Sequence, residues 1–109
     1  MANAPLVVLT TCPDTDTAQT LAKDLVTNGL AACVNILPQM QSVYLWKGEY
    51  QSGDEYQLVI KTMSNRYQSL QDYIMANHPY EVAEIVALPI TDGSPAYLQW
   101  VADSCGETN

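Results

Sequence analysis

The spacing of apolar side chains predicts that the chain begins with a strand and then a helix. Residues 6–11 form an apolar run too short for a helix, and the run ends before Cys12-Pro13-Asp14, where proline stops a strand and aspartate is a good helix cap. Asn28-Gly29 then predicts the end of the helix, because glycine readily adopts the left-handed conformation found there. Between these signals the apolar residues recur at the spacing of one helical face: Ala18, Leu21, Ala22, Leu25 and Val26.

A long bent strand and its hairpin partner are predicted next. Residues 31–46 are rich in β-branched and aromatic side chains, but Pro38 cannot donate to a strand ladder, which predicts a bulge or bend in one long strand. Residues 47–54 are polar and contain Gly48 and Gly53, which predicts the hairpin connection, and a strand at 55–62 follows. After Pro38 one face carries Met40, Ser42, Tyr44 and Trp46, and the other carries Gln41, Val43, Leu45 and Lys47. The inward side chains of the second strand are Tyr56, Leu58 and Ile60.

A second helix, a fourth strand and a last helix complete the pattern. Ser64 predicts the cap of the second helix, which ends before Pro79 because the residue ahead of proline avoids helical geometry. His78 is therefore expected at the helix exit. Residues 84–90 predict a strand, and Ser94-Pro95 has the residue types that begin a helix. The apolar faces of the two helices are Tyr67, Leu70 and Ile74, and Tyr97, Leu98 and Val101.

The resulting order, β-α-β-β-α-β-α, predicts the ferredoxin-like α+β fold. Two strand-helix-strand halves with right-handed crossovers give an antiparallel sheet with helices on one face. We therefore expect residues 1–109 to form a single βαββαβ domain with a long bent β-hairpin and an extra C-terminal helix. The second face of the sheet stays uncovered and the hairpin carries apolar residues on both faces, so these surfaces predict self-association.

Composition narrows the classes of partner and location. Four basic against twelve acidic residues give a net charge of −8, which opposes binding to the phosphate backbone of nucleic acids. No apolar run reaches the length of a membrane span and no basic segment of a secretory signal is found at the start, so a cytoplasmic location is expected. Three widely spaced cysteines fit neither a disulfide framework nor a paired-cysteine zinc site, and they predict reduced thiols.

Several motifs occur together in order along the chain. They are Cys33-Val34-Asn35, residues 42–48 (SVYLWKG), Glu55 with Lys61-Thr62, residues 78–85 (HPYEVAEI) and Tyr97-Leu98-x-Trp100. With these motifs the chain resembles the CutA family of divalent-cation-tolerance proteins over roughly residues 6–101. Two positions depart from the family: Ala83 stands where proline is usual, and a cysteine sometimes found on the first strand falls instead at Cys12, in the predicted turn.

The resemblance implies a ferredoxin-like subunit and a homotrimer assembled through the extended hairpins. It also implies a role in tolerance to divalent metal ions, with copper binding, and a likeness to the trimeric PII signalling proteins. The expected partners are therefore further copies of the chain and divalent cations, copper foremost. No organic cofactor, nucleic acid or membrane is expected.

The candidate metal ligands are His78, Cys12 and Glu81. His78 is the sole histidine, and an imidazole beside cysteine and carboxylate groups suits copper or zinc. The alternative is an imidazolium that interacts with the helix dipole. Cys12 precedes a helix N-terminus, where the dipole would lower the pKa of its thiol and favour the thiolate. The alternative for a cysteine, favoured for Cys33, is packing in the core as a small apolar group.

A pocket between subunits is the second candidate site. Glu55 and Lys61 fall on the same face of one strand, where each would meet a charged partner of a neighbouring subunit, hold an anionic ligand, or form a surface ion pair. In a trimer this face lies beside the subunit boundary. The expected lining is Tyr44, Trp46, Glu55, Lys61, His78, Tyr80, Glu81 and Trp100, although tyrosine and tryptophan are also common interface anchors.

Three functions stay open at this point, and none is catalytic. The sequence contains no Gly-rich phosphate loop, nucleophile elbow or HExxH motif, so we do not expect an enzyme. The first hypothesis is a trimer that binds divalent metal ions near inter-subunit clefts. The second is a PII-like regulatory module that binds a small anionic ligand around Lys61. The third is a stable scaffold whose affinity for Cu²⁺ is incidental.

Overall fold

The computed structural model describes residues 2–105, and it confirms the predicted α+β fold with one strand more than expected. The elements are β1 (Pro5–Cys12), α1 (Thr15–Thr27), β2 (Cys33–Ile36), β3 (Met40–Trp46), β4 (Glu49–Met63), α2 (Ser64–Asn77), β5 (Ile85–Pro89) and α3 (Pro95–Ser104). Among the described residues, no helix combines the length and the apolar character that a membrane crossing requires.

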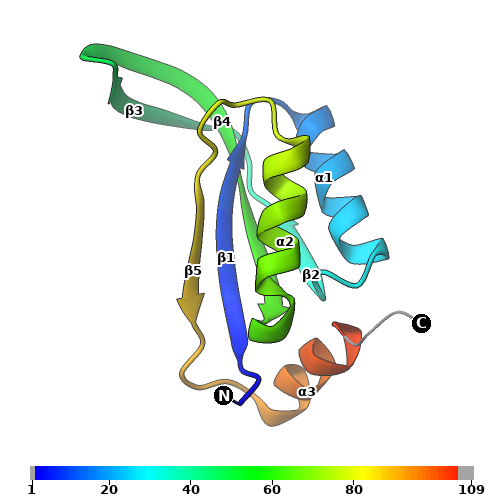
Figure 1. The fold of residues 1–109 in the computed structure, drawn as a ribbon. Helices are drawn as coiled ribbons and strands as arrows, with labels where there is room; N and C mark the ends of the chain where they lie inside the picture. The colour runs from blue at the N-terminus through cyan, green and yellow to red at the C-terminus, as the bar shows by residue number, and fades with distance from the viewer. Residues whose placement is uncertain (1, 106–109) are drawn as a thin grey trace.

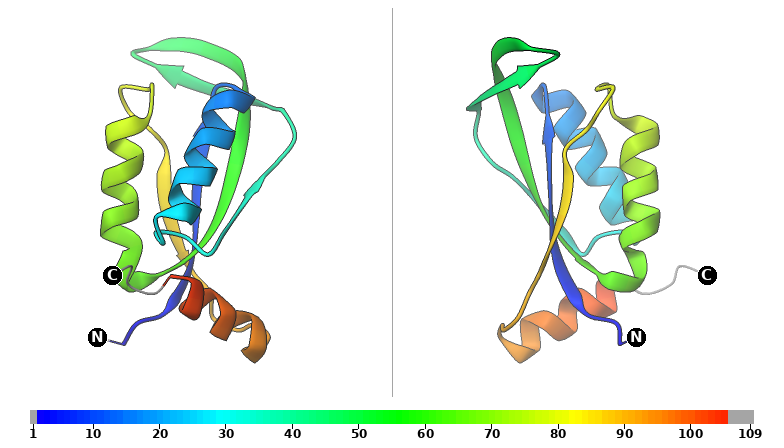
Figure 2. Two further views of the ribbon diagram at one scale, coloured as in Figure 1. Left: turned by 90° about the vertical axis from the view of Figure 1, so that its right-hand side faces the viewer. Right: turned by 60° about the vertical axis from the view of Figure 1, so that its left-hand side comes forward.

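The sheet is antiparallel and is organised around the long strand β4. Its order is β2-β4-β1-β5, and β3 pairs with the first half of β4. Helices α1 and α2 cover one face of the sheet, as Figures 1 and 2 show, while α3 lies at the end away from the hairpin. With β2 and β3 counted as two halves of one strand, this is the predicted ferredoxin-like arrangement.

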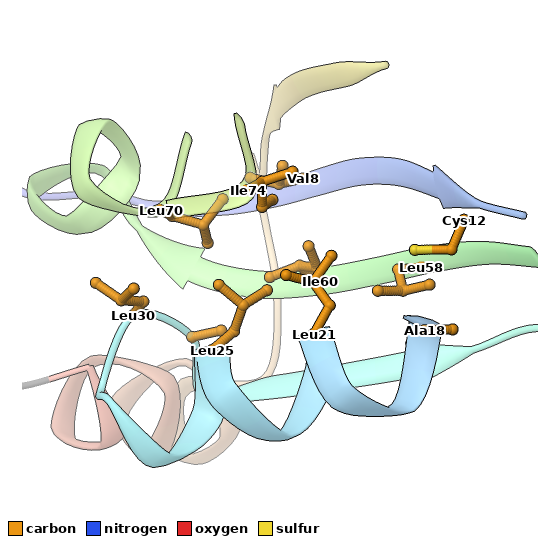
Figure 3. Packing of buried hydrophobic residues seen from close by; sticks show 11 residues of the cluster. Val8, Cys12, Ala18, Leu21, Leu25, Leu30, Leu58, Ile60, Leu70 and Ile74 are labelled. Carbon is orange, nitrogen blue, oxygen red and sulfur yellow. The ribbon is translucent and has the colours of Figure 1, made fainter. Parts of the chain in front are cut away.

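The main core lies between the two helices and the sheet (Figure 3). Strand alternation directs one set of side chains toward the helices, and helical spacing directs a matching set toward the sheet. Leu58 and Ile60 of β4 are fully buried there, as predicted, and Tyr56 packs against the edge of the cluster. The other large members are Val8, Leu21, Leu25, Leu70 and Ile74.

The predicted bend at Pro38 is confirmed, but the strand expected over residues 31–46 is divided there into β2 and β3, at Leu37, Pro38 and Gln39. Four steps lead from Ile36 to Met40, whereas their partners on β4, Leu58 and Glu55, are three steps apart, so one extra residue bulges out. Pro38 has no N–H for the ladder. The bend turns β3 away from the body of the sheet and points the hairpin beyond the helical layer (Figure 1).

The predicted hairpin connection over residues 47–54 was also wrong. The turn consists of Lys47 and Gly48 alone, both with positive φ (52° and 82°), as a two-residue type I′ turn requires. Strand β4 therefore begins at Glu49. Its first half is polar because it projects into solvent, and this polarity resembles that of a loop.

Local signals located the starts of α1 and α3 and the ends of α1 and α2. The Asp14 side chain accepts a hydrogen bond from Thr17 N (2.7 Å), which caps α1 and lowers the pKa of this carboxyl below its ordinary value. Ser94 caps α3 in the same way. The prediction that Ser64 caps α2 was wrong. Its hydroxyl accepts a hydrogen bond from Ala4 N (2.9 Å) instead and so connects the start of the chain to the helix.

Candidate functional site

A cleft of about 440 Å³ lies under the β3–β4 hairpin, where the connection from α2 to β5 crosses the end of β1. The hairpin forms one wall because the bend at Pro38 carries β3 over this connection. Its lining residues are Thr11, Tyr44, Trp46, Glu55, Pro79, Tyr80, Glu81, Val82 and Glu84. Three of them are aromatic and three are acidic, so the cleft combines apolar ring faces with negative charge.

Strand alternation gives the two faces of the hairpin different surroundings. Tyr44 and Trp46 point to the cleft side, together with Glu55 from β4. Val43 and Leu45 point to the opposite side, where Leu45 is paired with Tyr50. We refer to Val43, Leu45 and Tyr50 as the outer face of the hairpin.

Glu55 is the buried carboxylate of the cleft, with only 8% of its surface exposed. Its Oε2 accepts a hydrogen bond from the Tyr80 hydroxyl at 2.9 Å. Burial raises the pKa of Tyr80, and the bond to Glu55 raises it further, since both disfavour a phenolate. Tyr80 therefore stays a phenol that donates to Glu55 and holds the loop after α2 against β4.

His78 is placed at the end of α2, as predicted, but both of its ring nitrogens are engaged. Nε2 lies 2.6 Å from the carbonyl oxygen of Thr11, and Nδ1 accepts from the backbone N–H of Tyr80 at 3.1 Å. Both contacts are satisfied by a neutral ring with its proton on Nε2. The residue therefore fastens the α2–β5 connection to β1, and metal ligation would require breaking one of these bonds.

The predictions that Cys12 lies in a turn and carries a readily formed thiolate were wrong. Cys12 is the last residue of β1, paired with Tyr56, and its side chain is fully buried at the end of the core near Leu58 and Ala18 (Figure 3). Burial raises the pKa of the thiol to about 11, with smaller contributions from the charges of Asp14 and Glu55. Desolvation thus outweighs the helix dipole.

Glu81 lies at the exposed rim of the cleft. Its Oε2 is 4.0 Å from Nζ of Lys47, and that ammonium lies 5.5 Å from the ring centroid of Trp46. At the rim, the ammonium group of Lys47 therefore lies between the ring of Trp46 and the carboxylate of Glu81.

Three residues predicted for the pocket, His78, Lys61 and Trp100, do not line this cleft. Lys61 is six residues further along β4 than Glu55, hence about 20 Å away at the rise of a β-strand, and its Nζ donates to Asn35 Oδ1. Trp100 is on α3, where its ring contacts Tyr97. The predicted lining left out Glu84, although this residue belongs to the 78–85 motif, which was the available signal.

Within residues 2–105, no three His, Cys, Asp or Glu side chains come close enough together to hold an ion. The three predicted ligands lie in different environments: the Cys12 thiol is buried, the His78 nitrogens are engaged in hydrogen bonds, and Glu81 is exposed beside Lys47.

Comparisons with known proteins agree with the motifs. Residues 6–104 match the family model of the CutA1 divalent ion tolerance protein. The chain is 46% identical to the divalent-cation tolerance protein CutA of Thermus thermophilus, with 92% of this chain and 97% of the relative covered. It is 47% identical to the protein CutA homolog of Xenopus laevis over 85% of this chain, but spans only 62% of that relative's length.

Solved structures share the fold over almost their whole length. The Cut A1 structure from Thermus thermophilus superimposes with a TM-score of 0.91 at 45% identity, covering 94% of this chain and 99% of that one. The CutA1 structure from Oryza sativa gives 0.92 at 40% identity, with 95% of each chain covered. The predicted resemblance is thus confirmed, and the chain belongs to the CutA1 family of divalent ion tolerance proteins.

Proposed function

We propose that this protein works in divalent-cation tolerance as a homotrimer, joined through its hairpins, that binds divalent cations, copper foremost, beside the clefts between subunits. The observation that carries the assembly is the outer face of the hairpin, where Val43, Leu45 and Tyr50 are 61%, 72% and 69% exposed. A projecting two-stranded ribbon is only marginally stable alone. Burial of this apolar face against another copy would stabilise the hairpin, and three copies is the number that the family resemblance implies.

The uncovered face of the sheet supports the same assembly. Val86 and Leu88 of β5 are exposed, and they pair with Leu9 and Val7, which alternate with the core residue Val8 and so point away from the helices. An uncovered sheet face that carries large apolar side chains fits an interface better than a monomer's exterior. Hairpin and sheet face together offer two patches, as a closed ring of identical subunits requires.

Substitution Leu45→Lys is expected to dissociate the assembly. The change places a charge in the centre of the outer face, where burial without a partner would be unfavourable. Native mass spectrometry should show three times 12.0 kDa for the parent chain and a shift to single chains for the variant. Met75→Lys, the same change at a 62% exposed residue of α2, is the control and should keep the parent mass. A parent chain that is monomeric at micromolar concentration contradicts the proposal.

For the metal, we propose that carboxylates at the cleft rim, Glu81 foremost, act together with donors of a neighbouring subunit. Cu²⁺ prefers nitrogen and oxygen ligands, and His78, three residues before Glu81 on the same connection, would join by giving up its bond to Tyr80 N. Cys12 is left out of this set, because a buried thiol with a raised pKa is a poor ligand.

Calorimetric titration with Cu²⁺ tests this arrangement. We expect His78→Ala and Glu81→Gln each to weaken binding by roughly tenfold or more, as loss of a supporting group at metal sites does. Cys12→Ser should leave the affinity unchanged, and Leu45→Lys should abolish it by separating the subunits. If the affinity for Cu²⁺ is no better than micromolar and none of these variants changes it, the result would instead support the hypothesis of a stable scaffold whose metal affinity is incidental.

The PII-like alternative stays a prediction. Within one subunit an anion in the cleft would meet Glu55, Glu81 and Glu84, and Lys61 lies elsewhere on the open face. That function therefore depends on the Lys61 of a neighbouring subunit. A small anion whose binding is lost in Lys61→Ala but kept in His78→Ala would favour it over the metal site.

A further inference from the structure

We infer that Asn28 is a deamidation site and that opening of the C-terminal turn of α1 controls its reaction. Asn28-Gly29 is the sole Asn-Gly pair of the chain. Asparagine reacts most readily before glycine, because glycine has no side chain to obstruct attack by its own backbone nitrogen. Metal binding and assembly play no part in this reaction.

The reaction needs only water and the two residues themselves. The backbone nitrogen of Gly29 loses its proton to solvent hydroxide and attacks Cγ of Asn28. A bond from this nitrogen to Cγ forms, the Cγ–Nδ2 bond breaks, and Nδ2 takes up a proton from water and leaves as ammonia. A second water then opens the cyclic imide at one of its two carbonyl carbons, which leaves aspartate or isoaspartate at position 28. The sum is an amide hydrolysis, without oxidation or reduction.

In the folded chain both reacting groups are engaged in hydrogen bonds. Nδ2 of Asn28 donates to the carbonyl oxygen of Asp24 at 2.7 Å, and the backbone N–H of Asn28 donates to the same oxygen at 3.1 Å. The Gly29 N–H donates to the carbonyl oxygen of Val26 at 3.1 Å. Attack requires that Gly29 N loses its proton and that the Asn28 side chain turns toward it. These bonds must therefore break first.

The peptide groups after Asn28 are held in place as well. The Gly29 carbonyl oxygen accepts from Nε of Arg66, on α2, at 3.1 Å. Gly29 is buried and has a φ of 69°, and the next two N–H groups, those of Leu30 and Ala31, donate to Leu25 O. Solvent hydroxide therefore reaches the Gly29 nitrogen only when the turn opens, and Arg66 connects that turn to the second helix.

The product cannot restore the original turn. A carboxylate at position 28 has no N–H to donate to the Asp24 carbonyl oxygen, and it adds negative charge at the C-terminal end of a helix, where the helix dipole is unfavourable to it. Deamidation therefore converts a transient opening into a permanent weakening of the α1 end. Each chain carries a covalent record of how often this turn has opened.

Incubation in mildly alkaline buffer, followed by peptide mapping with mass spectrometry, tests the inference. The reference is a synthetic peptide of residues 22–35 in the same buffer. We expect Asn28 to react about tenfold or more slowly in the native chain than in the peptide, because opening the turn breaks several hydrogen bonds. Arg66→Met removes the contact with the Gly29 carbonyl and should speed the reaction of the native chain by roughly threefold or more.

Lys23→Met is the matched control, because Lys23 is exposed on α1 and the change removes the same charge. It should alter the rate less than about twofold, as expected for a screened surface charge. Circular dichroism verifies the fold of both variants. Equal rates in the peptide and the native chain, or in Arg66→Met and Lys23→Met, would overturn the inference.

Hydrogen exchange of the Gly29 N–H, followed by NMR in the parent chain, measures the same opening without any substitution. Its protection should match the slowing of deamidation within about threefold, because both reactions need the same open turn. A Gly29 N–H that exchanges as fast as in the peptide would contradict the inference, whatever the variants show.

Discussion

Replacing Leu58 with alanine is expected to lower the free energy of unfolding by about 2–5 kcal/mol, the range for a fully buried leucine truncated in a core. Leu58 lies on β4 and is completely buried in the main cluster. The central strand pairs with three others and cannot move to fill the cavity without disturbing them. Denaturant unfolding, followed by circular dichroism at one fixed protein concentration, measures the loss.

Met75→Ala provides the comparison for this substitution. Met75 is an apolar side chain of α2 that is 62% exposed, so its truncation leaves no cavity, and alanine keeps the helix favourable. We expect a change within about 0.5 kcal/mol. A Leu58→Ala loss below about 1 kcal/mol would show that the core described here repacks freely, contrary to the dense interior expected of a folded protein.

A second large effect is expected in alkaline solution, where the protein should lose about 2–3 kcal/mol of stability between pH 9 and pH 11 through Cys12 alone. The thiol has an ordinary pKa of 9.0 and a pKa of about 11 in the fold. Below pH 9 both states keep the proton, so the contribution is fully present. Between the two values the unfolded chain releases its proton while the native chain holds it, and stability falls as pH rises.

The raised pKa of Tyr80 acts in the same direction, since burial and the bond to Glu55 disfavour its ionisation in the fold. Unfolding free energies at pH 8 and pH 10.5 measure the combined loss. In Cys12→Ala the unfolding free energy should fall less between these pH values, because the contribution of the Cys12 thiol is removed. In Cys33→Ala, which removes a thiol outside this site, the contribution of Cys12 should remain. Identical slopes for Cys12→Ala and the parent chain would refute the assignment.

Secondary structure was predictable wherever its cause was local. Helix α1 has its cap at Asp14, its stop at Asn28 and one continuous apolar face, so a short stretch of sequence carries every signal. The start of β4 was missed because residues 49–54 pair only with β3 and lie far from the core, so their composition resembles that of a loop. Ser64 was misassigned because its hydroxyl is engaged by Ala4, a contact across sixty residues of sequence.

The sequence predicted most residues of the candidate site, but it did not predict their chemical state. Motif reasoning selected Tyr44, Trp46, Glu55, Tyr80 and Glu81, which the structure gathers in one cleft. It assigned His78 and Cys12 to a metal, but the occupancy of the His78 nitrogens and the burial of Cys12 are properties of their surroundings. Lys61 shares a face with Glu55, and only the length of β4 separates the two.

The order of elements, the apolar faces of helices and strands and the family motifs are thus contained in the sequence, because spacing and local hydrogen bonds determine them. The tertiary structure decided which carboxylates surround the cleft, which thiol is buried from solvent and which groups are hydrogen-bonded to the imidazole nitrogens. Those properties follow from desolvation and contact between groups distant along the chain. The bend at Pro38 is an example: the sequence indicates that a bend occurs, but only the folded chain shows that the hairpin beyond it lines the same cleft as Glu55.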